Sequence, residues 1–143
     1  MEFVWLIFAI LSAVTAALVA IFGKIGLEGV DANTATMIRA GIMFVVLTLV
    51  ILFTGKLGQI STILSNQKAF FYILLSGVAG ALSWLFYFVA LKLGKASQVA
   101  PIDRLSVVFV IIFAALILGE KITQKVAIGT ALMAAGAILV VLG

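Results

Sequence analysis

Charged residues at two places in otherwise apolar stretches could do chemistry in this chain: Arg39 and the adjacent pair Asp103-Arg104. Asp103 could take a proton or bind a cationic amine, and Arg39 could bind an anionic group or orient Asp103 by an ion pair. Lipid tails cannot solvate such charges, so each must face protein, water or headgroups. Arg39 and Asp103 are therefore candidate substrate-binding residues.

Each charge also has an interpretation that involves no site. Arg39 lies about two turns into its expected helix and could extend along its own stem to the headgroups. A helix that began at Pro101 would hold Asp103 near its N-terminus, where the helix dipole favours an acid. A helix that began at Ser97, a candidate cap residue, would place Asp103 about 9 Å deep, where it needs a partner. The sequence leaves both starts open.

Small and polar residues follow one face of the stretch from residue 69 to residue 91. These residues are Ser76, Gly80, Ser83 and Tyr87. Their spacing of four, three and four puts them on one side of a helix. Packing alone could explain them, because small residues let helices approach closely in lipid. Alternatively the face lines a cavity, with Trp84 in an aromatic wall. The full candidate set is Ser12, Thr15, Arg39, Ser83, Trp84, Tyr87 and Asp103.

The chain lacks the residue patterns of an enzyme or a metal protein. It has no cysteine and no histidine, which argues against a zinc site and thiolate chemistry. No G-x-S-x-G motif, phosphate loop or pair of carboxylates at catalytic spacing occurs. The basic residues are scattered and form no cluster of the kind that tracks phosphates. We expect no catalytic residue, no metal, no cofactor and no nucleic-acid partner.

The composition places the chain in a lipid bilayer. Hydrophobic residues make up 66% of the 143 residues and charged residues only 10%, whereas a soluble domain carries roughly 25% charged residues. The first apolar run is longer than a signal-peptide core of about 7–15 residues, and it follows the acidic Glu2 rather than a basic start. We interpret it as a retained transmembrane helix.

Five apolar stretches reach the roughly 20 residues that a helix needs to cross the hydrocarbon core. They cover about residues 3–23, 33–54, 69–91, 97–119 and 123–142. Short connections make neighbouring helices antiparallel, and Thr123 is the expected cap of the last helix. The predicted fold is all-α: a single domain over residues 1–143, built as an up-down bundle of five transmembrane helices.

The chain resembles the EamA-type family of the drug/metabolite transporter superfamily, most clearly in its C-terminal half. The residues that carry the resemblance are Ala90-Leu91, Gly94, Ala96-Ser97, Gly119-Glu120, Ile122-Thr123, Gly129 and Gly136, with Arg39 in NTATMIRAGIMFVVL. The resemblance covers nearly all of one five-helix repeat. One departure is clear: many members have a proline around the middle of the fourth helix, where this chain has Leu105-Ser106-Val107-Val108. Whether this helix bends as theirs do stays open.

The resemblance implies a transporter made of two five-helix repeats in inverted orientation, of which this chain is one. Two identical chains would then pair antiparallel. The basic residues near the two membrane faces are almost balanced, so they set no single orientation. On the face of the N-terminus these are Lys56, Lys68, Lys121 and Lys125; on the other they are Lys24, Lys92 and Lys95, with Arg39 and Arg104 counted in part.

The leading functional hypothesis is an inner-membrane or plasma-membrane transporter of small metabolites or drug-like amphiphiles. It would work as an antiparallel homodimer by alternating access, with a midplane substrate site between the repeats. The alternatives are a non-transporting accessory subunit, half of a heteromeric pair with a related chain, and a flippase for a lipid-linked sugar. The sequence does not choose the substrate, the energy source or the direction of transport.

Overall fold

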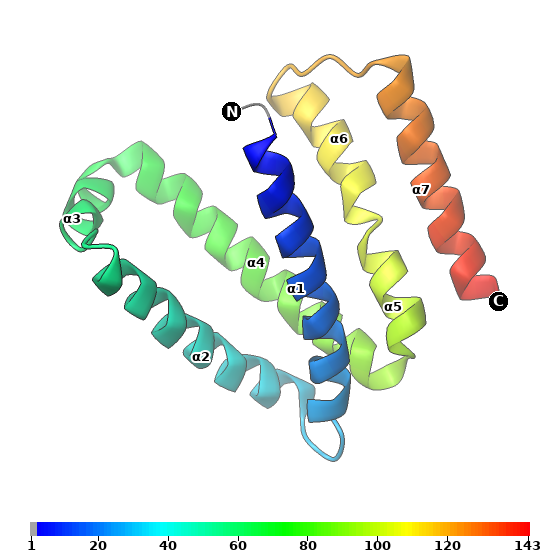
Figure 1. The fold of residues 1–143 in the computed structure, drawn as a ribbon, viewed down its shortest axis with the longest axis horizontal. Helices are drawn as coiled ribbons and strands as arrows, with labels where there is room; N and C mark the ends of the chain where they lie inside the picture. Colours follow the sequence, from blue (N-terminus) through cyan, green and yellow to red (C-terminus); the bar gives the residue numbers. More distant parts are fainter. Residues whose placement is uncertain (1–2) are drawn as a thin grey trace. The chain divides into compact units, whose positions relative to one another are not determined.

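The computed structural model describes residues 3–143, which form helices and short connections and contain no strand (Figure 1). The helices are α1 (Val4–Gly26), α2 (Ala32–Phe53), α3 (Gly58–Ser65), α4 (Gln67–Leu93), α5 (Ala96–Asp103), α6 (Ser106–Ile117) and α7 (Gln124–Leu142). Five spans are long and apolar enough to cross a membrane, with α5 and α6 together forming the fourth. The predicted all-α fold with five transmembrane helices is confirmed.

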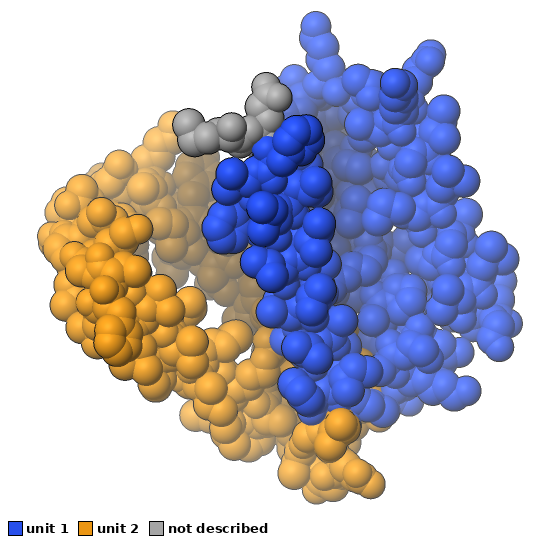
Figure 2. Space-filling model, viewed as in Figure 1, with its two compact units in different colours: residues 1–24, 93–143 blue, residues 25–92 orange. Residues whose placement is uncertain are grey.

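The described chain divides into two compact units (Figure 2). Residues 25–92 form one unit, which contains α2, α3 and α4. The stretch up to Lys24 and residues 93–143 form the other, which contains most of α1 with α5, α6 and α7. Whether residues 1–143 act as a single domain stays a prediction.

The α2–α4 unit is a helical hairpin closed by α3 (Figure 1). Asp31 caps α2 by accepting a hydrogen bond from the backbone N–H of Thr34 at 2.8 Å, as expected of an aspartate at this position. Gly55 ends α2 with a positive φ of 67°, which glycine adopts without strain. The backbone N–H of Lys56 then donates to the carbonyl of Ile51 at 3.1 Å. The connection between the second and third spans holds the short helix α3.

In the other unit, α7 packs along α5 and α6 (Figure 1). Thr123 caps α7, as predicted: its hydroxyl oxygen accepts from the backbone N–H of Val126 at 3.3 Å. Gly119 ends α6 with a φ of 69°, and the N–H of Glu120 donates to the carbonyl of Ala114 at 3.1 Å. The Gly119-Glu120 pair therefore works as a helix stop.

The fourth span is interrupted, whereas the sequence predicted one continuous helix over about residues 97–119. Pro101 lies inside α5, where it lacks the N–H that would bond to the preceding turn. The next turn tightens: the N–H of Val107 bonds to the carbonyl of Arg104 at 3.1 Å, and that of Val108 to Leu105 at 2.9 Å. These bonds join residues three apart, as in a 3₁₀ turn. The span therefore breaks at Arg104–Leu105 without a proline in its middle.

The start of α5 decides between the two interpretations of Asp103. The helix begins at Ala96 with Lys95 as its N-cap, so a start at Pro101 is wrong. Ser97 is the second helical residue and not the cap. Asp103 is the last residue of α5, about 10 Å along the axis from Ala96, and its side chain is half-buried.

Few side chains are buried within the described residues. Leu91 and Phe88 are buried, and the others of this kind are mostly alanines. Large apolar side chains such as Phe44, Phe53 and Leu116 are more than 70% exposed. A soluble protein rarely leaves so much contiguous apolar surface in water, so these faces belong against lipid tails or other helices.

Candidate functional site

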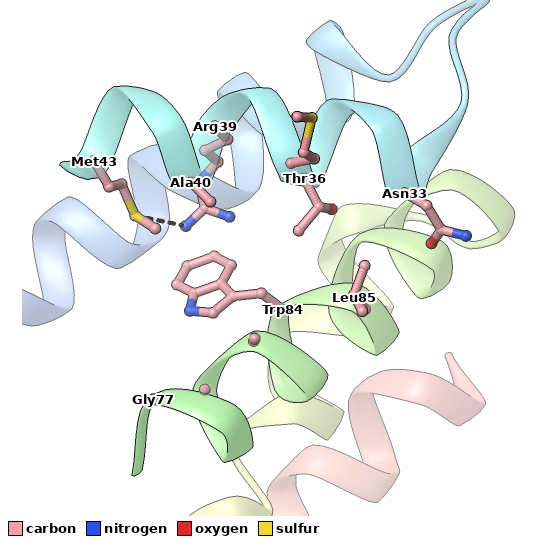
Figure 3. A pocket seen from close by; sticks show the side chains of 11 residues that line it. Asn33, Thr36, Arg39, Ala40, Met43, Gly77, Trp84 and Leu85 are labelled. Atoms are coloured by element: carbon pink, nitrogen blue, oxygen red, sulfur yellow. Dashed lines mark hydrogen bonds between the residues drawn. The ribbon is translucent and has the colours of Figure 1, made fainter. Parts of the chain in front are cut away.

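A pocket of about 430 Å³ lies between α2 and α4 (Figure 3). All of its lining residues belong to the α2–α4 unit. They are Asn33, Thr36, Met37, Arg39, Ala40, Met43, Gly77, Gly80, Ala81, Trp84 and Leu85. The volume falls in the range of about 300–1,000 Å³ that is usual for small-molecule sites.

Helical spacing explains how the sequence forms this pocket. On α2, lining residues recur every three or four positions from Asn33 to Met43, so they share one face. On α4 the facing residues include Gly77, Gly80 and Ala81, whose side chains are absent or single methyl groups. Large residues at these three places would fill the space between the helices. The pocket therefore exists because α4 is small where it faces α2.

Arg39 reaches across from α2 to the aromatic residues of α4. Its guanidinium carbon lies 3.3 Å from the centre of the Trp84 ring and 4.7 Å from that of Phe88. Figure 3 shows the guanidinium above the indole, with its Nη2 donating to the sulfur of Met43 at 3.7 Å. Cation–π contacts of this kind are worth about 0.5–2 kcal/mol. They hold the guanidinium against the α4 rings that it covers, and the depth of Arg39 in the membrane stays a prediction.

The two helices around Arg39 provide no acidic partner for its charge. Neither α2 nor α4 contains an aspartate or glutamate, and Arg39 is the only charged residue among the described residues that line the pocket. Arg39 lies about 10 Å along the axis from the first residue of α2. An unpaired charge inside a membrane span is costly, so Arg39 needs a polar or aromatic partner. The pocket is therefore a cationic site with apolar walls.

An aromatic cluster on α4 supports the ring that Arg39 covers. The Trp84 ring centre lies 6.0 Å from Tyr87 and 5.9 Å from Phe88, and Tyr87 and Phe88 are 6.0 Å apart. The Trp84–Tyr87 and Tyr87–Phe88 pairs are edge-to-face, an arrangement worth about 0.5–1.5 kcal/mol for each pair. Because Phe88 is buried, the cluster fixes the indole in place.

The start of α2 is held by contacts of its own. Lys92, at the end of α4, donates to the carbonyl of Val30 at 2.6 Å. The backbone N–H and then the hydroxyl of Thr34 donate to the Asp31 carboxylate, which lowers the pKa of Asp31 below its usual range. Asp31, the acid nearest to the pocket in the sequence, is therefore engaged as the cap of α2. Thr36 is buried and donates its hydroxyl to the carbonyl of Ala32 at 2.8 Å.

The structure brings together three of the predicted site residues. Arg39 and Trp84 line the pocket, and Tyr87 packs against Trp84. Ser83 is exposed on α4 and is not among the lining residues. The remaining candidates, Ser12, Thr15 and Asp103, belong to the other unit. Thr15 donates its hydroxyl to its own helix, to the carbonyls of Leu11 and Ser12. A role for these four residues at the site stays a prediction.

Most of the apolar lining was missed from the sequence. The polar stripe predicted on α4 passed through Ser76, Gly80, Ser83 and Tyr87. Of these only Gly80 lines the pocket, together with the predicted Trp84 and with Gly77, Ala81 and Leu85. The predicted face is rotated by about one residue, or 100°. The available signal was the run of small residues at positions 77, 80 and 81, opposite a cation seven residues into α2. The residues missed are Asn33, Thr36, Met37, Ala40, Met43, Gly77, Ala81 and Leu85.

Comparison with known proteins places the chain in a family. The EamA-like transporter family matches residues 3–142. The chain belongs to this family. A relative from Sinorhizobium sp., described as an uncharacterized transporter in the cobO 3' region, is 43% identical over 135 residues, which cover 94% of each chain. No solved structure shows significant similarity to the chain.

Family membership confirms the resemblance read from the sequence. An EamA-like chain with five apolar spans is a multi-pass membrane protein. Both the family and the Sinorhizobium relative support a role in transport rather than in catalysis. The α2–α4 pocket is the candidate place where such a protein meets its substrate.

Proposed function

We propose that this EamA-like chain transports small metabolites or drug-like amphiphiles across the inner or plasma membrane. The observation that carries the proposal is the Arg39 guanidinium over Trp84 in a pocket of small-molecule size. Apolar walls with few polar groups are typical of ligand sites. Arg39 orients the substrate, and Trp84, with Tyr87 behind it, supplies the aromatic wall.

The working unit is a homodimer of two chains in opposite orientation. Five spans put the two ends of a chain on opposite membrane faces, so an inverted partner restores the symmetry of an inverted-repeat transporter. Substrate then reaches a midplane site between the copies, where Ser12, Thr15 and Ser83 add polar contacts. Asp103 takes up a proton or a cationic amine there.

The break in the fourth span supports alternating access. A 3₁₀ turn inside a helix often marks a hinge, and the turn at Arg104–Leu105 follows directly on Asp103. Bending at this turn lets α5 and α6 tilt separately. Asp103, which we propose takes up the proton, is thereby next to the bend in the chain.

A transport assay with a defined mixture tests the function. Purified protein is placed in liposomes and offered amino acids, carboxylates, nucleosides and quaternary ammonium dyes, and accumulated compounds are identified by mass spectrometry. We expect accumulation of at least one amphiphilic compound that empty liposomes lack. Arg39→Gln should reduce it, whereas Lys56→Gln, which removes a cation outside the pocket, should not. Equal accumulation by wild type, Arg39→Gln and empty liposomes would refute transport through this pocket.

Topology reporters test the antiparallel homodimer. Because the basic residues are nearly balanced between the two faces, C-terminal reporters should give signal from both sides of the membrane. Added lysines beside Lys56 and Lys68 should fix one orientation, and added lysines beside Lys92 and Lys95 the other. Each fixed form alone should be inactive, and co-expression should restore transport. Signal from a single side at native expression would rule out the antiparallel homodimer.

A further inference from the structure

We infer that the α2–α4 pocket binds amphiphilic organic anions, and that Arg39 holds the anionic group. This inference names a substrate class and rests on the proposed function. Its basis is the charge of the pocket: one guanidinium, no carboxylate among the described lining residues, and no acid anywhere on α2 or α4. A cation in apolar surroundings attracts an anion more strongly than it would in water, because the local dielectric constant is lower.

The hydrogen bonds of Arg39 leave its fork available. A guanidinium carries five N–H donors, and the hydrogen bond that the structure gives Arg39 is to the Met43 sulfur at 3.7 Å, a weak acceptor. The guanidinium face is covered by the Trp84 ring, so its donors point along its edges. Carboxylates bind such a fork through two parallel hydrogen bonds. The fork therefore fits an oxyanion headgroup, either a carboxylate or a phosphate.

The acids nearest to Arg39 in the sequence do not compete for this fork. Residues 25–92 contain two acids, Glu28 and Asp31, and both precede α2. Asp31 accepts hydrogen bonds from the backbone and hydroxyl of Thr34 at 2.8 and 2.9 Å. It lies eight residues before Arg39, about 12 Å away along the helix. An incoming carboxylate thus meets a cation without an internal partner in its unit.

The rest of the lining indicates what kind of ligand body, apart from the anionic group, fits the pocket. From Asn33 to Met43 the α2 face extends about 15 Å, and beyond Arg39 the pocket is lined by Met43, Ala40 and Gly77. Met37 and Met43 have flexible thioether side chains that adapt to different shapes. The pocket therefore accepts an aromatic or short aliphatic body and tolerates variation in it.

Equilibrium binding of matched probes tests this inference without requiring transport. The chain has two tryptophans, Trp5 and Trp84, so Trp5→Phe leaves Trp84 as the reporter beneath Arg39. Its fluorescence is titrated with phenylbutyrate, phenylbutanol and phenylbutylamine, which share one body and differ in charge. We expect phenylbutyrate to bind at least about tenfold more tightly than the other two. Equal affinities, or tightest binding of the amine, would overturn the inference.

Variants assign the preference to Arg39. In the Trp5→Phe background, Arg39→Gln should bring phenylbutyrate to the affinity of phenylbutanol, and Arg39→Lys should retain part of the difference, since it keeps the charge without the fork. Lys56→Gln should keep the full preference. An anion preference that survives Arg39→Gln would place the anion elsewhere. Tighter phenylbutyrate binding by Asp103→Asn would identify Asp103 as the resident counterion of Arg39 and overturn the inference.

A lipid headgroup is the other source of an anionic amphiphile, and the membrane composition separates the two. Phenylbutyrate affinity is measured in nanodiscs of phosphatidylcholine, with and without phosphatidylglycerol. We expect similar affinities. If phosphatidylglycerol weakens phenylbutyrate binding to the wild type but not to Arg39→Gln, the lipid headgroup occupies the pocket. That result would rule out a soluble substrate there. Anion binding without uptake into liposomes would refute the proposed function alone, and uptake restricted to cations would refute the anion site alone.

Discussion

The α2–α4 hairpin and the α5–α7 segment cross the membrane with different internal construction. In the hairpin both spans are unbroken helices of 22 and 27 residues, and long side chains bridge the space that small residues leave between them. In the α5–α7 segment one span contains Pro101 and a 3₁₀ turn, and it packs directly on α7. Continuous helices hold a binding geometry, whereas an interrupted helix can bend. We therefore propose that the hairpin binds the substrate and that the fourth span bends during transport.

Filling the hairpin pocket should have the largest effect. A Cβ added at Gly80 meets no atom within 4 Å, so Gly80→Leu should fold and direct its side chain into the pocket. We expect phenylbutyrate affinity, read from Trp84 fluorescence, to fall by more than about tenfold. Gly41→Leu is the matched control: it has the same free space, lies on α2 and does not line the pocket. Unchanged binding by a folded Gly80→Leu protein would show that the ligand lies elsewhere.

Replacing Pro101 in the fourth span should have an intermediate effect, raising stability and slowing movement. Pro101→Ala restores an N–H that can bond to the carbonyl of Ser97 and removes the ring clash, a gain of about 1–3 kcal/mol. Thermal unfolding in detergent should therefore shift upward, while the transport rate falls several-fold and phenylbutyrate affinity stays the same. A stabilised variant that transports at the wild-type rate would show that movement of the fourth span does not depend on Pro101.

The smallest expected effect contrasts the caps of the two regions. Asp31 caps α2 with a titratable group whose pKa is lowered by hydrogen bonds from Thr34, whereas Thr123 caps α7 with a hydroxyl. A lowered folded-state pKa means that Asp31 stabilises above its unfolded pKa, about 3.9, and that this contribution is lost as pH falls through the folded value. Asp31→Ala should therefore be less stable than wild type at neutral pH and approach it below about pH 4.

Two controls sharpen this contrast. Asp31→Asn keeps a capping oxygen without a charge, so its stability should not show the same acid dependence. Thr123→Ala should cost about 0.5–2 kcal/mol at every pH, since the hydroxyl does not titrate in this range. The measurement is the thermal unfolding midpoint in detergent as a function of pH. A pH-dependent loss for Thr123→Ala would mean that the two caps do not differ as described.

The sequence by itself determined the membrane class, the five spans, the Thr123 cap and the family. These features depend on local composition and on spacing along one helix: apolar runs of spanning length, a threonine before a helix, a glycine-glutamate stop. Arg39 and Trp84 were also found from residue type, because a cation and a large aromatic residue in an apolar span need an explanation. Such features can be recognised without knowing which helix packs alongside.

Only the tertiary structure decided which faces meet. A rotation of one residue, about 100°, separates the predicted stripe through Ser83 from the observed lining through Gly77 and Trp84, and no property of α4 alone fixes that rotation. The same holds for Arg39, whose stem could reach headgroups or a neighbouring ring until α4 placed Trp84 beneath it. The break at Arg104–Leu105 also lay outside the sequence pattern, because Pro101 removes only its own bond to the preceding turn, whereas the break consists of bonds between residues three apart after Arg104. Local chemistry selects the candidate residues, and the packing of one helix against another selects which of them share a site.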